Sequence, residues 1–117
     1  MGWDAYSSVD KLKGDTKAKA KKAFIEAHKR VLKKCGEVDF YLHDGALDVS
    51  WSGHMLSQAT NEPVYVDKPW DIEKVHKLRN KANWNFEYEK EQEWAYWSAR
   101  EFLNVCAKYN LSITFSY

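Results

Sequence analysis

The chain has 117 residues, of which 44% are hydrophobic and 30% are charged, and its formal net charge is +1. This length and balance predict one globular domain over residues 1–117 with a single core. Apolar runs are only a few residues long and the first residues lack a charged-then-apolar pattern, so we expect neither a membrane span nor a secretory signal.

The charge is spread unevenly along the chain. Residues 1–34 contain ten Lys or Arg against four Asp or Glu, whereas residues 35–117 contain eight against thirteen. The first part is therefore basic and the second acidic. This split indicates a basic face for an anionic partner, or more simply the solvated face of a lysine-rich helix.

Two cysteines, Cys35 and Cys106, fall on the apolar faces of two predicted helices. Free thiols in such positions behave as small hydrophobic core residues. We therefore expect both to be free in a reducing cytoplasm, with a disulfide between them as the alternative.

The opening segment, residues 1–14, contains tryptophan and tyrosine side chains that are too large for a free tail and are expected to pack onto the domain. A helix over residues 15–35 is predicted next, and Gly36 ends it. Lysines occupy most of its outer face. Its inner arc includes His28, which is interpreted as a buried histidine with a hydrogen-bond partner or, alternatively, as a ligand-binding or catalytic group.

Residues 38–49 predict a β-hairpin. Apolar and polar residues alternate over residues 38–42, and the His43-Asp44-Gly45 tripeptide that follows is typical of a tight turn. Residues 46–49 could supply the return strand. A short helix over residues 51–60 is then predicted, with Asp48 or Ser50 as its N-cap.

A second amphipathic helix is predicted over residues 70–82, with Pro69 at its first position and Ile72 among its inward-facing residues. Residues 64–66 form at most a short strand. Aromatic residues then alternate with polar ones over residues 84–89, which is typical of a half-buried strand.

The clearest element is a helix over residues 94–109. Its apolar residues follow the helical period and fill one half of the helix circumference, with only Ser98 interrupting them. Two large aromatics, Tyr96 and Trp97, stand on the otherwise polar half. Asn110 is expected to end the helix, and residues 111–117 alternate as a C-terminal strand.

Together these elements predict an α+β domain. We expect a small, mostly antiparallel sheet of three or four strands, with three to four helices packed on one face. No internal repeat, low-complexity segment or flexible linker is present.

Motifs that would indicate catalysis or a cofactor are absent from the sequence. The four histidines lack the spacing that places two of them on one helix face, and no CxxC pair, nucleophile elbow or Gly-rich phosphate loop occurs. His43, Asp44, Asp48 and His54 form the one cluster that could converge on a metal or a substrate. We therefore expect no enzyme, no metal and no cofactor.

The aromatic residues supply the main functional hypothesis. Tyr, Trp and Arg are enriched in interface hot spots, so Tyr96, Trp97, Arg100, Asn104 and Lys108 are predicted to form a partner-binding surface. The same set could stack a base and pair a phosphate. A third interpretation buries Tyr96 and Trp97 under the N-terminal segment or the lysine-rich helix.

Three stretches, MGWDAYSS, HDGALDVS and EWAYWSAREFL, resemble segments of small uncharacterised proteins encoded by tailed bacteriophages and prophages. No functional motif lies in them. The resemblance implies a setting, because small phage proteins of this kind often bind or block a host component.

The leading expectation is thus a non-enzymatic cytoplasmic binding protein that engages or inhibits a host protein. The alternative is a pocket that sequesters an anionic small molecule such as a nucleotide. Direct nucleic-acid binding through the lysine-rich helix ranks third. The C-terminal strand, residues 111–117, could also pair with a second copy to form a homodimer.

Overall fold

The computed structural model describes residues 4–36, 42–48 and 52–116. Within them the chain forms four α-helices, three β-strands and three short 3-10 turns. The helices are α1 (Gly14–Cys35), α2 (Ser52–Thr60), α3 (Ile72–Lys81) and α4 (Glu93–Lys108), and the strands are β1 (Asp4–Ser7), β2 (Ala46–Asp48) and β3 (Ile113–Ser116).

The three strands form one antiparallel sheet in the order β2-β1-β3. Tyr6 in β1 lies opposite Ala46 in β2 and Thr114 in β3. The expected α+β fold with a small antiparallel sheet is confirmed. The N-terminal segment was expected only to pack onto the domain, yet it supplies the central strand, because four residues are too few to show a strand period in the sequence.

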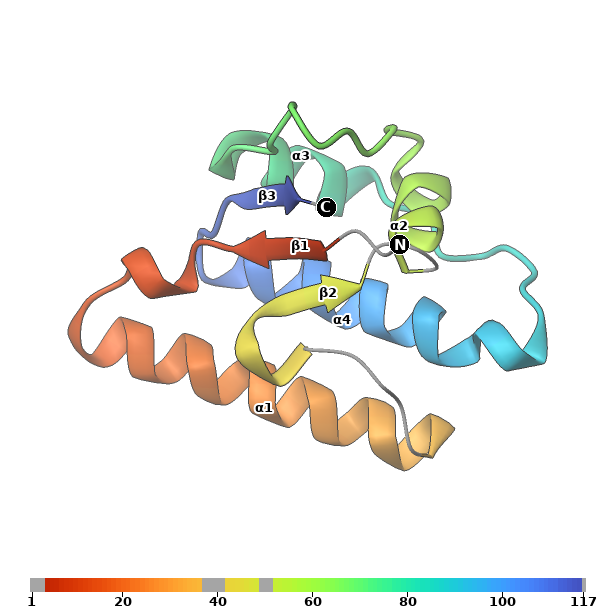
Figure 1. Ribbon diagram of the computed structural model, residues 1–117, viewed down its shortest axis with the longest axis horizontal. Coiled ribbons are helices and arrows are strands. Elements are labelled where there is room, and N and C mark those ends of the chain that lie inside the picture. Colours follow the sequence, from red (N-terminus) through yellow and green to blue (C-terminus); the bar gives the residue numbers. More distant parts are fainter. Residues whose placement is uncertain (1–3, 37–41, 49–51, 117) are drawn as a thin grey trace.

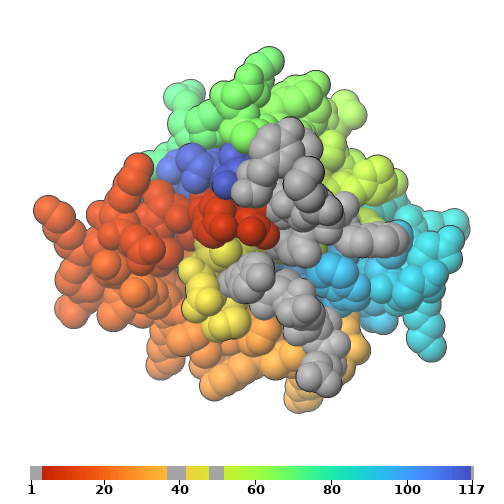
Figure 2. Space-filling view, in the orientation of Figure 1, coloured from red at the N-terminus to blue at the C-terminus, as the bar shows by residue number. Residues whose placement is uncertain are grey.

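The helices pack on one face of the sheet, as predicted. In Figure 1, α4 runs behind the sheet, with α1 along one side and α3 along the other. Ala5, Leu47 and Phe115 are buried on the inner face, whereas Tyr6 on the outer face is 45% exposed. Figure 2 shows the strands at the surface in the centre of this view, with no described helix in front of them.

Helix α4 is the core of the helical layer, because it contacts α1, α2, α3 and β2. The predicted apolar half is buried except at its two ends, where Trp94 and Tyr109 are only partly buried. Ser98 is accommodated within it since its hydroxyl donates a 2.5 Å hydrogen bond to the carbonyl oxygen of Trp94. Both cysteines are free, with Cys106 fully buried. The buried residues of α4 are Ala95, Tyr96, Ser98, Ala99, Phe102, Leu103, Val105, Cys106 and Ala107.

The predicted strand over residues 84–89 is wrong. The segment forms no strand ladder with the described residues, although Trp84, Phe86 and Tyr88 alternate between exposed neighbours. All three rings pack against one residue of α4, Tyr96, with ring centroids 4.4 to 5.6 Å from it. The two-residue period thus arises from packing on a helix, and a sequence pattern does not distinguish that from packing in a sheet.

The predicted start of the second amphipathic helix is also wrong. Asp71, not Pro69, precedes the first turn of α3, and its carboxylate accepts a 2.8 Å hydrogen bond from the N–H of Lys74. Trp70 is held outside the helix because its N–H and C=O exchange 2.9 Å hydrogen bonds with Ile113. Ile72, expected to face inward, is 43% exposed.

The predicted hairpin is changed at its first strand. Residues 38–41 and 49 lie outside the described residues, and Leu42–Asp44 forms a 3-10 turn. The return strand exists as β2. Gly45 leads into it with a φ of +77°, and a Cβ there would lie 2.8 Å from the Ser7 hydroxyl oxygen. Only glycine therefore suits this turn.

The end of α4 agrees with the prediction. Asn110 adopts a left-handed φ of +56°, a conformation that asparagine tolerates better than most residues. The N–H of Leu111 donates a 2.9 Å hydrogen bond to the carbonyl oxygen of Cys106. This cap turns the chain back toward β3.

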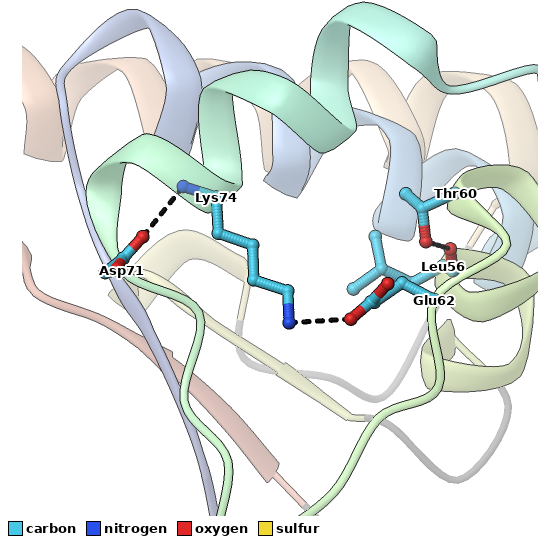
Figure 3. Close-up of polar contacts among 5 residues, drawn as sticks. All are labelled: Leu56, Thr60, Glu62, Asp71 and Lys74. Atoms are coloured by element: carbon cyan, nitrogen blue, oxygen red, sulfur yellow. Dashed lines mark hydrogen bonds and ion pairs between the residues drawn. The ribbon is translucent and has the colours of Figure 1, made fainter.

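A polar clamp joins the loop after α2 to helix α3, as Figure 3 shows. The ammonium of Lys74 lies 2.6 Å from a carboxylate oxygen of Glu62. At the end of α2, the hydroxyl of Thr60 donates a 2.8 Å hydrogen bond to the carbonyl oxygen of Leu56. The hydrogen bond from Lys74 lowers the pKa of Glu62 below its ordinary value of 4.5.

We expect Glu62→Gln to lower the free energy of unfolding at pH 7 by about 0.5 kcal/mol, because the pair is partly exposed and screened. A carboxyl whose pKa is lowered by folding stabilises the protein above its unfolded pKa, and this contribution disappears as the pH falls below 4.5 through the folded pKa. Urea denaturation at pH 7 and near pH 3 measures the change. The exposed Glu91→Gln is the matched control, and an equal loss at both pH values would contradict the assignment.

Candidate functional site

Helices α1 and α4 lie side by side and run in opposite directions. Lys34 near the end of α1 places its ammonium 4.4 Å from the ring centroid of Trp97 near the start of α4. About one turn along each helix, Arg30 Nε lies 2.5 Å from Glu101 Oε2. The two contacts thus link the helices at successive turns.

Beyond the Arg30–Glu101 pair, a groove of about 370 Å³ lies between the two helices. Its charged lining consists of the cations Lys19, Lys22, Arg30 and Lys108 and the carboxylates Glu26 and Glu101. One cation is already used, since Arg30 binds Glu101, and Glu26 lies 3.9 Å from Lys29. Three exposed lysines therefore make the groove basic.

We call this surface the α1–α4 face and define it by Lys19, Lys22, Arg30 and Lys34 of α1 with Trp97, Glu101, Asn104 and Lys108 of α4. Trp97 is its aromatic member. The ring is only partly buried, and the Arg100 guanidinium carbon lies 5.3 Å from its centroid. A partly exposed indole between two cations is an arrangement found in binding surfaces.

Tyr96 is buried although it lies on the polar half of the helix, so it is not part of an exposed partner-binding surface; burial was one of the three interpretations that the sequence left open. Its side chain is 6% exposed, and its ring stacks on Tyr88 at a centroid distance of 4.4 Å. Its hydroxyl donates a 2.7 Å hydrogen bond to the carbonyl oxygen of Trp84. The covering element is the 84–89 segment, which the sequence interpretation had placed in a sheet.

The other three predicted site residues, Arg100, Asn104 and Lys108, have different surroundings. Arg100 does not line the groove, and it donates a 3.3 Å hydrogen bond to the hydroxyl of Tyr96. Asn104 lines the groove and accepts a 3.3 Å hydrogen bond from Arg79 of α3. Lys108 is exposed at the far end of the groove. The structure thus brings Trp97, Asn104 and Lys108 onto one stripe of α4.

The predicted partner-binding surface did not include the cations of α1, although the N-terminal lysines were expected as phosphate partners in the alternative small-molecule pocket. The lysine-rich helix itself is plain in the sequence, but no sequence pattern shows which of its lysines lie beside α4. The period of α4 does carry a signal, because positions 97, 101, 104 and 108 fall on one side of the helix.

Neither cysteine is an activated nucleophile. Burial raises the pKa of Cys106 well above its ordinary value. Burial and the nearby carboxylate of Glu93 also raise the pKa of Cys35, against the opposing effect of Lys34. Both groups therefore remain thiols at neutral pH.

The histidine and aspartate cluster does not converge among the described side chains. His43 Nε2 lies 3.4 Å from Asp44 Oδ2 beside one cavity, whereas His54 lines a different one. The side chain of Asp48 is outside the described residues. His28 is partly buried against His43, with ring centroids 4.7 Å apart, and burial lowers its pKa.

Within residues 4–36, 42–48 and 52–116, no group of His, Cys, Asp and Glu side chains could hold a metal ion. None of the helices described there combines the length and the apolar composition needed to cross a membrane.

The fold and the α1–α4 face define a small α+β protein with an exposed basic groove between two antiparallel helices. No family model matches the chain, and no curated protein or solved structure shows significant similarity to it.

Proposed function

We propose that the chain is a small non-enzymatic binding protein that engages an acidic surface of a partner protein through the α1–α4 face. The observation that carries the proposal is the sequence of contacts along the α1–α4 face: Lys34 over Trp97, then the Arg30–Glu101 pair, then the basic groove. The α1–α4 face thus combines a partly exposed indole with exposed ammonium groups along two antiparallel helices.

The composition of the α1–α4 face favours a macromolecular partner. Trp and Arg are enriched among the residues that dominate the energetics of protein interfaces. Trp buries a large, rigid ring at a small entropic cost, and Arg presents a planar group with five hydrogen-bond donors. Exposed lysines around them steer an oppositely charged partner toward the site. The excess of lysine in the groove therefore selects an acidic partner surface.

The resemblance to tailed-phage proteins supplies the setting for this proposal. A phage accessory factor has the host's own proteins as its targets, and binding or blocking one of them requires no catalytic group. We therefore infer that the acidic partner is a host protein.

The groove itself favours a second candidate, the sequestration of an anionic small molecule such as a nucleotide. Its volume of about 370 Å³ is within the range of ligand sites. Lys19, Lys22 and Lys108 could pair with phosphate or carboxylate oxygens, and Tyr109 lines the same groove as an aromatic surface.

Native mass spectrometry of the protein isolated gently from its source cells tests both candidates. We expect a co-purifying acidic protein, and we expect the double variant Lys22→Glu/Lys34→Glu to lower its recovery by about tenfold or more, because two attractive charges become repulsive. Lys11→Glu/Lys21→Glu is the matched control, since both lysines are exposed and Lys21 lines a cavity on another side of α1.

The outcomes separate the candidates. A bound mass of a few hundred daltons that is lost in the groove variant would favour the small-molecule alternative. Equal loss of the partner in both double variants would show that net charge, and not the α1–α4 face, holds it.

A further inference from the structure

The segment over residues 84–89 is an extended chain with no strand beside it in the described structure. Figure 1 draws it as the connection between α3 and the first turn before α4. Trp84, Phe86 and Tyr88 are half-buried, and the residues between them are exposed. Its side chains therefore alternate as they do in a strand at the edge of a sheet.

The backbone of this segment is largely unpaired. Within the described residues, the N–H and C=O groups of Phe86, Glu87 and Tyr88 take part in no hydrogen bond. The carbonyl oxygen of Trp84 is bound by the Tyr96 hydroxyl, and that of Glu89 by the N–H of Gln92. The middle of the segment thus presents free donors and acceptors between two anchored ends.

A cavity lies along this segment. It has a volume of about 580 Å³. It is lined by three residues of α2, by three residues of the segment and by one residue just after it, namely His54, Met55, Gln58, Glu87, Tyr88, Glu89 and Gln92. The cavity shares no lining residue with the groove of the α1–α4 face. An added chain would therefore have space beside the unpaired backbone.

We infer that the 84–89 segment binds an extended basic peptide by strand addition, with Lys or Arg side chains beside Glu87 and Glu89. Strand addition uses backbone hydrogen bonds for affinity and alternate side chains for specificity. Glu87 and Glu89 are exposed and on the same side of the segment, so the matching peptide carries cations at alternate positions.

The charges also argue against a second copy of this segment as the occupant. Antiparallel pairing of two such segments around Glu87 would place carboxylates of both copies opposite one another. Like charges directly across a strand pair are destabilising. The segment therefore selects a partner of opposite charge.

The direct test uses a capped hexapeptide in which lysine alternates with valine. We expect saturable binding by isothermal titration calorimetry, with shifts of the backbone amide signals of residues 86–88 in NMR spectra. Two further peptides test the backbone contact. One has its valine amides N-methylated and the other its lysine amides, so each lacks the N–H donors along one edge of the extended peptide and keeps the charge. One of the two methylated peptides should bind about tenfold more weakly or worse.

A second experiment reverses the charges of the segment. Glu87→Lys/Glu89→Lys should lose the lysine peptide by about tenfold or more and should gain binding of the glutamate-valine hexapeptide. Asp67→Lys/Glu73→Lys changes the net charge equally at exposed sites that do not line this cavity, and it should keep the original preference. Far-UV circular dichroism confirms that each variant is folded.

Two results would overturn the inference. If the lysine peptide does not bind at millimolar concentration, the segment takes no basic strand. If both N-methylated peptides bind as tightly as the parent peptide, the contact is ionic only, and no strand is added.

Discussion

Replacing Tyr96 with alanine is expected to lower the free energy of unfolding by about 3–5 kcal/mol, the usual cost of removing a large buried aromatic side chain. The ring is 6% exposed and is in contact with the rings of Trp84, Phe86 and Tyr88. For a domain of this size the midpoint of thermal unfolding should fall by about 10 °C or more.

Tyr96→Phe separates the ring from its hydroxyl. This variant keeps the ring contacts. It removes the 2.7 Å hydrogen bond to the carbonyl oxygen of Trp84 and the 3.3 Å hydrogen bond that the hydroxyl accepts from Arg100. It should cost about 1 kcal/mol. If Tyr96→Ala also costs only about 1 kcal/mol, the 84–89 segment is not held on α4 by this ring, and the aromatic cluster has been assigned too large a role.

The second large effect is expected at Trp70. Its side chain is 1% exposed and meets Phe115 of β3 edge-on at a centroid distance of 5.2 Å. Trp70→Ala should destabilise the protein by about 3–5 kcal/mol in urea denaturation, because it opens a cavity between β3 and the start of α3. The backbone hydrogen bonds to Ile113 do not depend on the side chain, so the loss reports packing.

Two further variants calibrate that measurement. Trp70→Phe keeps an aromatic ring and should cost about half as much. Tyr65→Ala lies in the same connection but at a side chain that is 47% exposed, and it should change stability by about 0.5 kcal/mol or less. Similar losses for Trp70→Ala and Tyr65→Ala would contradict the position of Trp70 in the core.

Local patterns in the sequence predicted the helices well. The helix over residues 94–109 appears as α4, the helix over residues 15–35 as α1, and the short helix over residues 51–60 as α2. Each has a hydrophobic stripe at the helical period, and such a stripe is a property of neighbouring residues alone. The end of α4 at Asn110 was predictable for the same reason.

The errors occur where a residue's partner lies in a different element of the fold, whether that element is near or far in the sequence. The alternation of residues 84–89 indicated a strand, but those aromatic side chains pack on α4. Trp70 was assigned to a helix, but its backbone pairs with Ile113, which is 43 residues away in the sequence. A local pattern records that a side chain is buried and does not record what covers it.

For the candidate site, too, some features were predictable from the sequence and others were not. The sequence by itself determined the basic helix, the apolar period of α4 and the presence of large aromatic residues on its polar half. Only the tertiary structure decided that Tyr96 is buried whereas Trp97 meets Lys34, and that Lys19, Lys22 and Lys108 share one groove. The physical reason is that charge and periodicity are local properties of the chain, whereas exposure and a shared surface depend on which elements pack together.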